Sequence, residues 1–221
     1  MYGVVVGTSL AAQAGGVMAS VYAELGDAGQ LMGTAQDVGS GINSITGALG
    51  DRDIDVFKLY LPAGAFIANV TGPNPTDRPT NDNLFVLFDG NGRGLRADDD
   101  SGGLFSPFSP QVTENLAGGF YYLAILPFLA ASSPIDSSNL PLWISIQFPA
   151  NAAPDGPGAA NPWAGWSAFG NATAARTYTI TLSTSTISAV PIPAALPLFA
   201  AGLGAMGLMS RRKKRKAAVA G

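Results

Sequence analysis

Residues 55–61 read Asp-Val-Phe-Lys-Leu-Tyr-Leu, and this stretch indicates the fold class. Alternate positions of the stretch are uniformly apolar, namely Phe57, Leu59 and Leu61. A period of two places these side chains on one face of a β-strand, opposite Val56, Lys58 and Tyr60. The same alternation predicts strands at Leu142–Phe148, and at Thr177–Ser183 through Tyr178, Ile180 and Leu182.

Two short apolar runs, Leu84–Phe88 and Phe120–Leu126, predict central strands that are covered on both faces. Clusters of Gly, Pro, Asn and Asp, such as Thr71–Asn83 and Asp89–Gly94, are typical of turns between strands. Asn, Asp and Gly at 89–92 favour a turn between two strands. Together these patterns predict an all-β, antiparallel β-sandwich, with residues 24–50 as an extended entry segment.

The absence of histidine and cysteine limits the chemistry of the chain. It excludes Ser-His-Asp triads, thiolate nucleophiles, imidazole bases and cysteine-based zinc sites. Acid-base catalysis by a pair of carboxylates remains chemically open. Two pairs have the spacing that places both side chains on one side of a strand, namely Asp53 with Asp55 and Asp98 with Asp100. With no other catalytic group in view, we expect a non-catalytic body and not an enzyme.

Charge is distributed unevenly along the chain. Six of the 12 basic residues form one run, Arg211, Arg212, Lys213, Lys214, Arg215 and Lys216. Outside this run the chain has six basic and 15 acidic residues, and all the acidic ones lie between Glu24 and Asp155. Such a body repels nucleic acid and anionic lipid surfaces, so we expect no nucleic-acid partner.

Residues 1–23 are uncharged, apolar and small, which is typical of the apolar region of a signal peptide. Ala19 and Ala23 each follow a cleavage-like pattern with a small or apolar residue two positions earlier. No Lys or Arg precedes the apolar stretch, so an N-terminal strand is the alternative interpretation. We expect a signal peptide at 1–23 and a sandwich domain at 24–187.

Residues 188–221 form a three-part tail. Val190, Pro191, Ile192 and Pro193 are followed by an apolar stretch, 194–209, and then by the basic run 211–216. The stretch is shorter than the ~20 residues of an ordinary transmembrane helix and is interrupted by Pro197 and three glycines. The basic run would stay in the cytoplasm. An ordinary membrane anchor is the alternative to a signal that is later removed.

This order of Pro motif, short apolar helix and basic cluster resembles the PEP-CTERM sorting signal. Ile192 stands where that family often has Glu. The resemblance implies processing by an exosortase, transient insertion in the inner membrane, and release to the cell surface or to an exopolysaccharide matrix.

The predicted sandwich domain contains a series of short motifs in a fixed order along the chain. They are Asp53-Ile54-Asp55-Val56-Phe57, Gly64, Asp82-Asn83-Leu84, Leu87-Phe88-Asp89, Gly92 and Gly94, Asp98-Asp99, and Gly119–Ala124. This series resembles the bacterial pre-peptidase C-terminal domain, a jelly-roll-like β-sandwich. The resemblance implies an accessory module without catalytic residues.

Two groups of side chains are candidate binding sites. Carboxylate and amide oxygens at Asp89, Asn91, Asp98, Asp99 and Asp100 suit a calcium ion, and solvated turn carboxylates are the alternative. Trp163 and Trp166 lie in a loop rich in Pro and Gly, either as a platform for carbohydrate or as anchors of a crossover loop. Two functions stay open: a structural or adhesive matrix protein, and a secreted carbohydrate-binding or hydrolytic protein.

Overall fold

A computed structural model describes residues 20–50, 52–70, 82–101, 109–128, 132–145, 150–167 and 176–186. The chain divides into two compact units, Met1–Thr186 and Ile187–Gly221, and the second unit lies outside the described residues. The described part contains twelve β-strands and no α-helix. Within it, accordingly, no helix has the length and apolar character needed to cross a membrane.

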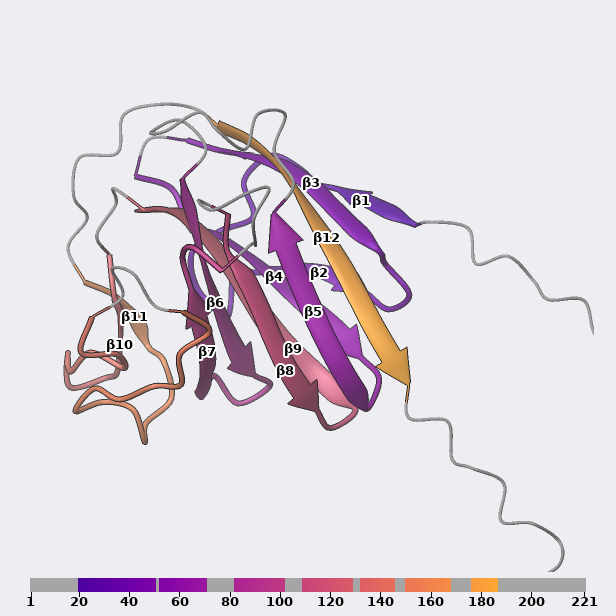
Figure 1. Ribbon diagram of the computed structural model, residues 1–221. Coiled ribbons are helices and arrows are strands. Elements are labelled where there is room, and N and C mark those ends of the chain that lie inside the picture. The colour runs from indigo at the N-terminus through magenta and orange to yellow at the C-terminus, as the bar shows by residue number, and fades with distance from the viewer. Residues whose placement is uncertain are drawn as a thin grey trace, which may run out of the picture. The chain divides into compact units, whose positions relative to one another are not determined.

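The strands of the body form two five-stranded sheets (Figure 1). Sheet A contains, in spatial order, β1 (Val21–Ala23), β3 (Ser44–Leu49), β12 (Arg176–Thr186), β5 (Gly64–Val70) and β8 (Gln111–Leu116). Sheet B contains β2 (Gln36–Gly39), β4 (Asp55–Leu61), β9 (Gly119–Pro127), β6 (Asn83–Asp89) and β7 (Gly94–Asp98). The predicted all-β sandwich is confirmed.

The sheets are mixed, whereas the sequence predicted antiparallel ones. β1 pairs in parallel with β3, and β2 pairs in parallel with β4. The first four strands alternate between the two sheets, so each of these pairs is connected through a strand of the opposite sheet and runs in one direction. The predicted entry segment 24–50 is therefore part of the sandwich, since it contains β2 and β3.

The main core lies between the two sheets. Phe57, Leu59 and Leu61 of β4 point into it, as the alternation predicted, and β12 contributes its own alternate apolar side chains. The buried members of this core are Ala28, Val38, Ile45, Leu49, Phe57, Leu59, Leu61, Phe66, Ala68, Val70, Phe85, Leu87, Val112, Leu116, Tyr121, Leu123, Ile125, Tyr178, Ile180 and Leu182.

A second core covers the outer face of sheet B. It joins outward side chains of β4, β6 and β9 to a covering segment, residues 132–167. Its buried members are Ile54, Val56, Leu84, Val86, Phe88, Ala97, Tyr122, Ala124, Leu126, Leu142, Trp143 and Trp163. The prediction that 84–88 and 120–126 are central strands covered on both faces is confirmed, apart from the exposed Phe120.

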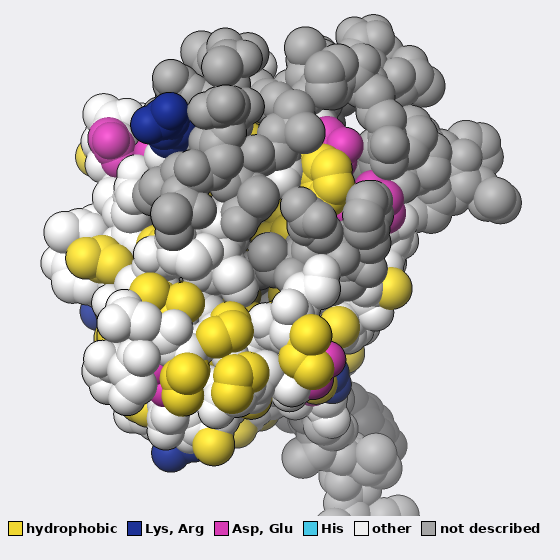
Figure 2. All heavy atoms as spheres, turned by 90° about the vertical axis from the view of Figure 1, so that its left-hand side faces the viewer, with side chains coloured by type: hydrophobic (Ala, Val, Ile, Leu, Met, Phe, Trp, Pro, Cys, Tyr) yellow, Lys and Arg dark blue, Asp and Glu magenta, His cyan; other side chains and the backbone are white. Residues whose placement is uncertain are grey.

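The described part of the covering segment is mostly irregular. It contains a two-stranded ribbon of β10 (Pro134–Ile135) and β11 (Gly165–Trp166). Figure 2, viewed from the side of this segment, shows separate apolar side chains among backbone, polar and a few charged atoms.

The predicted strand at 142–148 is wrong for its described residues, 142–145. Leu142 and Trp143 are both buried although they are neighbours, which a half-buried strand does not allow. The Leu142 amide donates to the Pro134 carbonyl, and Trp143 Nε1 donates to the Ala152 carbonyl. The segment hydrogen-bonds mainly to itself because it covers a sheet instead of extending one.

Trp163 fastens the covering segment to sheet B. Its ring stacks on Phe88 with centroids 4.6 Å apart and is 4% exposed. We expect Trp163→Ala to lower the free energy of unfolding by about 3–5 kcal/mol, because it leaves a large cavity. Ile144→Ala, a change at a side chain 73% exposed in the same segment, should stay within about 0.5 kcal/mol. Equal effects of the two changes in urea unfolding would contradict a tightly packed cover.

Candidate functional site

Three carboxylates meet at one edge of the inter-sheet core. Asp27 lies in the connection between β1 and β2, Asp53 precedes β4, and Asp55 is the first residue of β4. One oxygen of each lies within 4.8 Å of the others. We call these residues, together with Glu24, the acidic cluster.

Asp55 is the buried member of the acidic cluster. Asp55 lies two residues before Phe57 on β4, so its side chain is on the same, inward face as Phe57 and Leu59. It therefore points between the sheets and is 0% exposed. Tyr178 Oη, from β12 in the opposite sheet, donates to Asp55 Oδ2 at 2.6 Å. Asp55 Oδ1 is also buried and accepts no hydrogen bond. A buried carboxylate oxygen of this kind is destabilising unless a proton or a cation compensates it.

Glu24 joins the N-terminal connection to sheet A. Its Oε1 accepts from the Ala28 amide at 3.0 Å, and its Oε2 accepts from the Ala48 amide at 2.9 Å. Tyr178 Oη also lies 3.3 Å from Oε2. Position 47 must be glycine here, because a Cβ would collide with Glu24 Oε2 and Tyr178 Oη.

Asp27 and Asp53 form the outer side of the acidic cluster. Asp27 Oδ1 accepts from the Gly29 amide, and Asp53 Oδ2 accepts from the Gly50 amide, both at 2.8 Å. Asp27 is exposed and Asp53 is half-buried, so the cluster opens toward solvent on this side. Each loop is thus shaped by one carboxylate oxygen.

The charges of the acidic cluster alter the acidity of Asp55. Burial, the largest cause, and the neighbouring charges of Glu24, Asp53 and Asp27 together raise the pKa of its carboxyl to about 8, against the opposing hydrogen bond from Tyr178. Burial likewise raises the pKa of the Tyr178 phenol. At neutral pH the cluster therefore favours an added positive charge, either a proton on Asp55 or a bound cation.

The donor set fits calcium chemically. Calcium takes six to eight oxygen ligands, commonly carboxylates and backbone carbonyls, in flexible geometry. The acidic cluster supplies oxygens from three carboxylates, one of them with a buried oxygen that accepts no hydrogen bond. Asp53 and Asp55 are visible in the sequence as a pair, but Asp27 is brought to them only by the fold.

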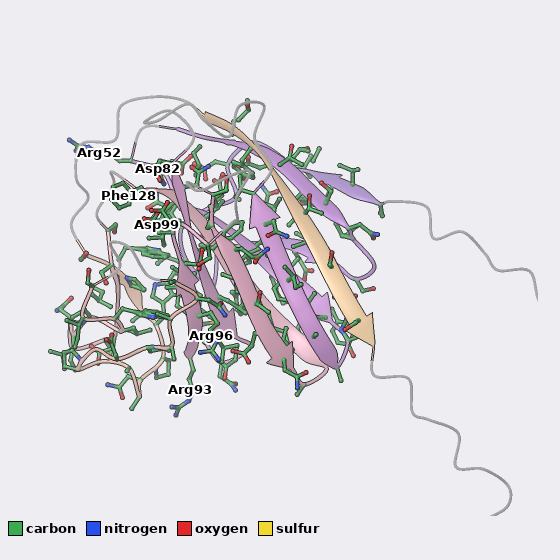
Figure 3. The ribbon with its side chains drawn as sticks, viewed as in Figure 1. Arg52, Asp82, Arg93, Arg96, Asp99 and Phe128 are labelled. Atoms are coloured by element: carbon green, nitrogen blue, oxygen red, sulfur yellow. The ribbon has the colours of Figure 1, made fainter. Side chains whose placement is uncertain are left out.

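The calcium ligands predicted from the sequence are not brought together as one set. Asp89 Oδ1 accepts from the amides of Asn91 and Arg93, at 2.8 and 2.9 Å, and shapes the predicted turn between β6 and β7. Figure 3 shows Arg93 at the opposite end of the sheet from Asp82 and Asp99. Asp89 and Asn91 therefore lie far from the other predicted ligands.

Asp98 has a structural role. Its Oδ1 accepts from the amides of Ser101 and Gln111, and its Oδ2 accepts from the Asn151 amide. This buried carboxylate thus joins the end of β7, the start of β8 and the covering segment. Three backbone amides thus occupy both of its oxygens, which fixes the side chain in a structural position.

Asp99 and Asp100 do come together, with Asp82 as a third member. One oxygen of each lies within 4.8 Å of the others, and Asp82 and Asp99 are buried. The sequence prediction included Asp99 and Asp100 but not Asp82, which precedes the neighbouring strand β6. Residues 71–81, before Asp82, and residues 102–108, after Asp100, lie outside the described part of the chain.

The tryptophans of the covering segment pack inward. Trp163 stacks on Phe88 and donates from Nε1 to the Gly165 carbonyl at 2.7 Å. Trp166 is half-buried and donates from Nε1 to the Gln30 carbonyl at 2.7 Å. Both rings therefore anchor the segment, and the buried Trp163 offers no platform for a sugar. The sorting motif 190–193 and the basic run 211–216 lie outside the described residues.

Comparisons with known proteins leave the family open. No protein-family model matches the chain, and no curated protein does. A pre-peptidase C-terminal domain of a collagenase from Bacillus anthracis is 13% identical, with a TM-score of 0.36, over 67% of this chain and 93% of that one. Aeromonas hydrophila PliG, a periplasmic inhibitor of g-type lysozyme, is 11% identical, with a TM-score of 0.33, over 75% and 96%. At this similarity neither neighbour identifies the chain.

The raised pKa of Asp55 predicts a pH-dependent stability when a chelator removes metal ions. The folded state keeps a proton on Asp55 up to about pH 8, whereas the unfolded chain loses it near the usual 3.8. Folding therefore takes up a proton between these values, and the free energy of unfolding should fall as the pH rises from about 4 to about 8. Urea unfolding across this range measures the slope.

Asp55→Asn should flatten this slope, because an amide keeps an acceptor for Tyr178 and does not titrate. Asp155→Asn, at an exposed carboxylate of the covering segment, is the control and should keep the slope. A slope that persists unchanged in Asp55→Asn would show that another group titrates.

Proposed function

We propose that this chain is an exported, exosortase-processed protein of the cell surface or extracellular matrix, with a non-catalytic β-sandwich that calcium stabilises. The sandwich is the observed fold. Delivery rests on the order of Pro motif, apolar stretch and basic run between Val190 and Lys216. The role of calcium rests on one observation, the buried Asp55 oxygen within the acidic cluster.

Calcium binding and export support each other physically. Extracellular calcium modules typically bind with dissociation constants of about 0.1–1 mM, a concentration met outside the cell. In the acidic cluster the ion would contact carboxylates of Asp27, Asp53 and Asp55, two of which also shape loops. It would neutralise the charge that destabilises these loops and so tighten the N-terminal connection against β4 of sheet B.

A structural or adhesive role is favoured over hydrolysis. The chain has no histidine or cysteine, and the carboxyl with the strongly raised pKa, Asp55, is wholly buried. Of the carboxylates nearer the surface, Asp89 shapes a turn and Glu114 pairs with Arg96 at 2.6 Å. A hydrolase that uses the Trp163 and Trp166 loop is disfavoured by the inward packing of those rings.

Processing of the N-terminus is proposed near Ala19. Val21–Ala23 forms β1, which pairs with β3 at the edge of sheet A. Cleavage after Ala23 would remove this strand, whereas cleavage after Ala19 leaves it intact. The β1 strand therefore favours the earlier of the two sites that the sequence offers.

Calcium should raise the melting temperature of the protein. At a concentration ten times the dissociation constant the gain is about 1.4 kcal/mol, roughly 3–5 °C for a domain of this size. Asp53→Asn should abolish this shift, and Asp89→Asn should preserve it, because Asp89 lies in a distant turn. Thermal unfolding in calcium and in chelator compares the three proteins. No shift in the unchanged protein would refute the calcium site.

The tail should be absent from the mature protein. We expect intact-mass measurement of protein taken from the cell surface to give a chain that begins near Ser20 and ends near Val190. Replacing Arg211–Lys216 with neutral residues removes the charge that keeps the C-terminus in the cytoplasm, so that variant should escape processing. A recovered chain that ends at Gly221 and stays in the inner membrane would identify a simple anchor.

A further inference from the structure

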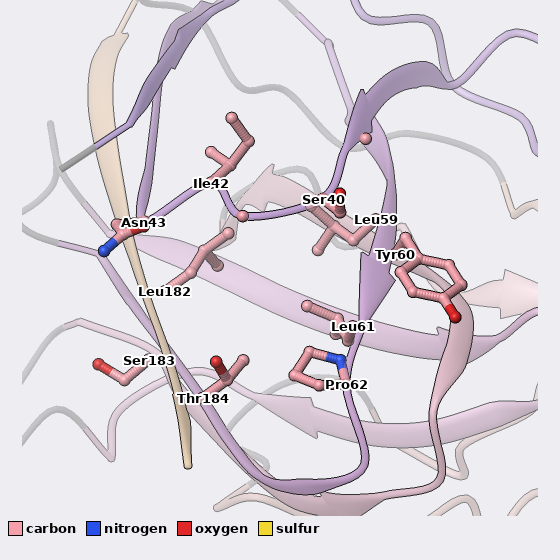
Figure 4. Close-up of a pocket in the computed structure, with 12 residues that line it drawn as sticks. Ser40, Ile42, Asn43, Leu59, Tyr60, Leu61, Pro62, Leu182, Ser183 and Thr184 are labelled. Carbon is pink, nitrogen blue, oxygen red and sulfur yellow. The ribbon is translucent and has the colours of Figure 1, made fainter. Parts of the chain in front are cut away.

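A cavity of about 580 Å³ opens at one end of the sandwich, away from the acidic cluster. It lies between the 39–43 connection, the end of β4 and the last part of β12 (Figure 4). β3 pairs with β12 only from Ser44, opposite Thr181, so the C-terminal part of β12 has no strand of sheet A on this side among the described residues. The cavity occupies this gap.

The lining combines polar groups with an apolar floor and contains no charged residue. Ser40, Asn43 and Thr184 provide hydroxyl and amide groups, while Leu59 and Leu182 form part of the floor. The Leu182 amide donates to the Asn43 carbonyl, and backbone groups alternate sides along a strand. The Thr184 amide and carbonyl therefore face the same side, toward the cavity.

Glycines keep the cavity open. Gly39 and Gly41 have φ angles of 78° and 73°, and a Cβ at either position would meet nothing within 4 Å. Positive φ is rarely adopted by residues with a Cβ, so the two glycines permit the path of the connection between β2 and β3 along the cavity. The result is a preformed recess of the size that small ligands occupy, about 300–1,000 Å³.

Two exposed aromatic rings lie next to the cavity, on the outer face of sheet B. Tyr60, which lines the cavity, is 46% exposed, and its cross-strand neighbour Phe120 is 48% exposed. The two rings pack edge to face with centroids 5.2 Å apart. Lys58 Nζ lies 4.5 Å from the Phe120 centroid and 2.9 Å from Asp37, which fixes Phe120 and neutralises the nearby charge. These are the only aromatic side chains among the described residues that are exposed.

We propose that this cavity and the Tyr60 ring bind an uncharged polysaccharide. A sugar ring has hydroxyl groups at its edge and C–H groups on its faces, so it needs hydrogen-bonding groups beside an exposed aromatic face. The hydrogen-bonding groups are those of Ser40, Asn43 and Thr184, and the aromatic face is that of Tyr60. The uncharged lining provides no partner for the carboxylate of an acidic sugar. This site goes beyond the proposed function and requires neither the sorting tail nor calcium.

Affinity electrophoresis of the full-length chain in mild detergent tests the site. The gels contain neutral polysaccharides (dextran, hydroxyethylcellulose or galactomannan) or the polyuronate alginate, each with calcium and with chelator. We expect at least one neutral polymer to retard the protein in both conditions, and alginate to have no effect. Retardation by alginate alone, or by none of the polymers, would overturn the proposal. A calcium site that fails does not affect this outcome, because binding is measured in chelator as well.

Variants then locate the binding. Tyr60→Ala should weaken retardation roughly tenfold by removing the stacking ring. Thr184→Trp, at an exposed strand position on the same face as Leu182, should abolish it by filling the cavity. Ile144→Ala, which removes an exposed apolar side chain elsewhere, should leave it unchanged. Melting temperatures confirm that each variant is folded.

Undiminished binding in both Tyr60→Ala and Thr184→Trp would place the polysaccharide elsewhere and refute the assignment. So would a dimer that forms with rising protein concentration and disappears in Tyr60→Ala, since the aromatic pair would then serve self-association. Binding of an extended peptide at this edge in place of neutral polymer would refute it as well.

Discussion

The central strands of sheet B are apolar on both faces, and the rest of the structure depends on that constraint. β6 is buried from Asn83 to Phe88, and β9 is buried from Tyr121 to Pro127. Burying such strands requires a layer on each side, because exposed apolar surface costs about 25 cal/mol per Å². Sheet A supplies one layer. The covering segment 132–167 supplies the other, with Trp143 and Trp163 as its largest buried side chains.

The same architecture places a carboxylate where water is excluded. Asp55 begins β4 on the inward side, so the parity that buries Phe57 also buries Asp55. Tyr178 from the opposite sheet donates to one oxygen, the other oxygen accepts no hydrogen bond, and the carboxylate lies beside Asp27 and Asp53. The acidic cluster thus arises from strand parity together with the approach of the N-terminal connection. A site of this kind couples occupancy by a proton or cation to the packing of the two sheets.

Local patterns predicted much of the fold and part of the candidate site. The alternation at 55–61 located β4 to the residue, and the turn at 89–92 was correct. Prediction failed at 142–145, where apolar residues with apparent alternation cover a sheet and do not pair in one. It also missed β1, β2, β3, β5, β7 and β8. The first two have only three and four residues, too few positions to display a period.

By itself the sequence determined that the body is all-β, that its central strands are covered twice, and that neither imidazole nor thiolate chemistry is available. These properties follow from local periodicity and from composition. Only the tertiary structure decided that Asp27 joins Asp55, that Trp163 packs inward, and that Tyr60 borders a cavity. Such contacts join residues far apart in the chain or set which face a side chain occupies, so they depend on strand order, which a period of two does not encode.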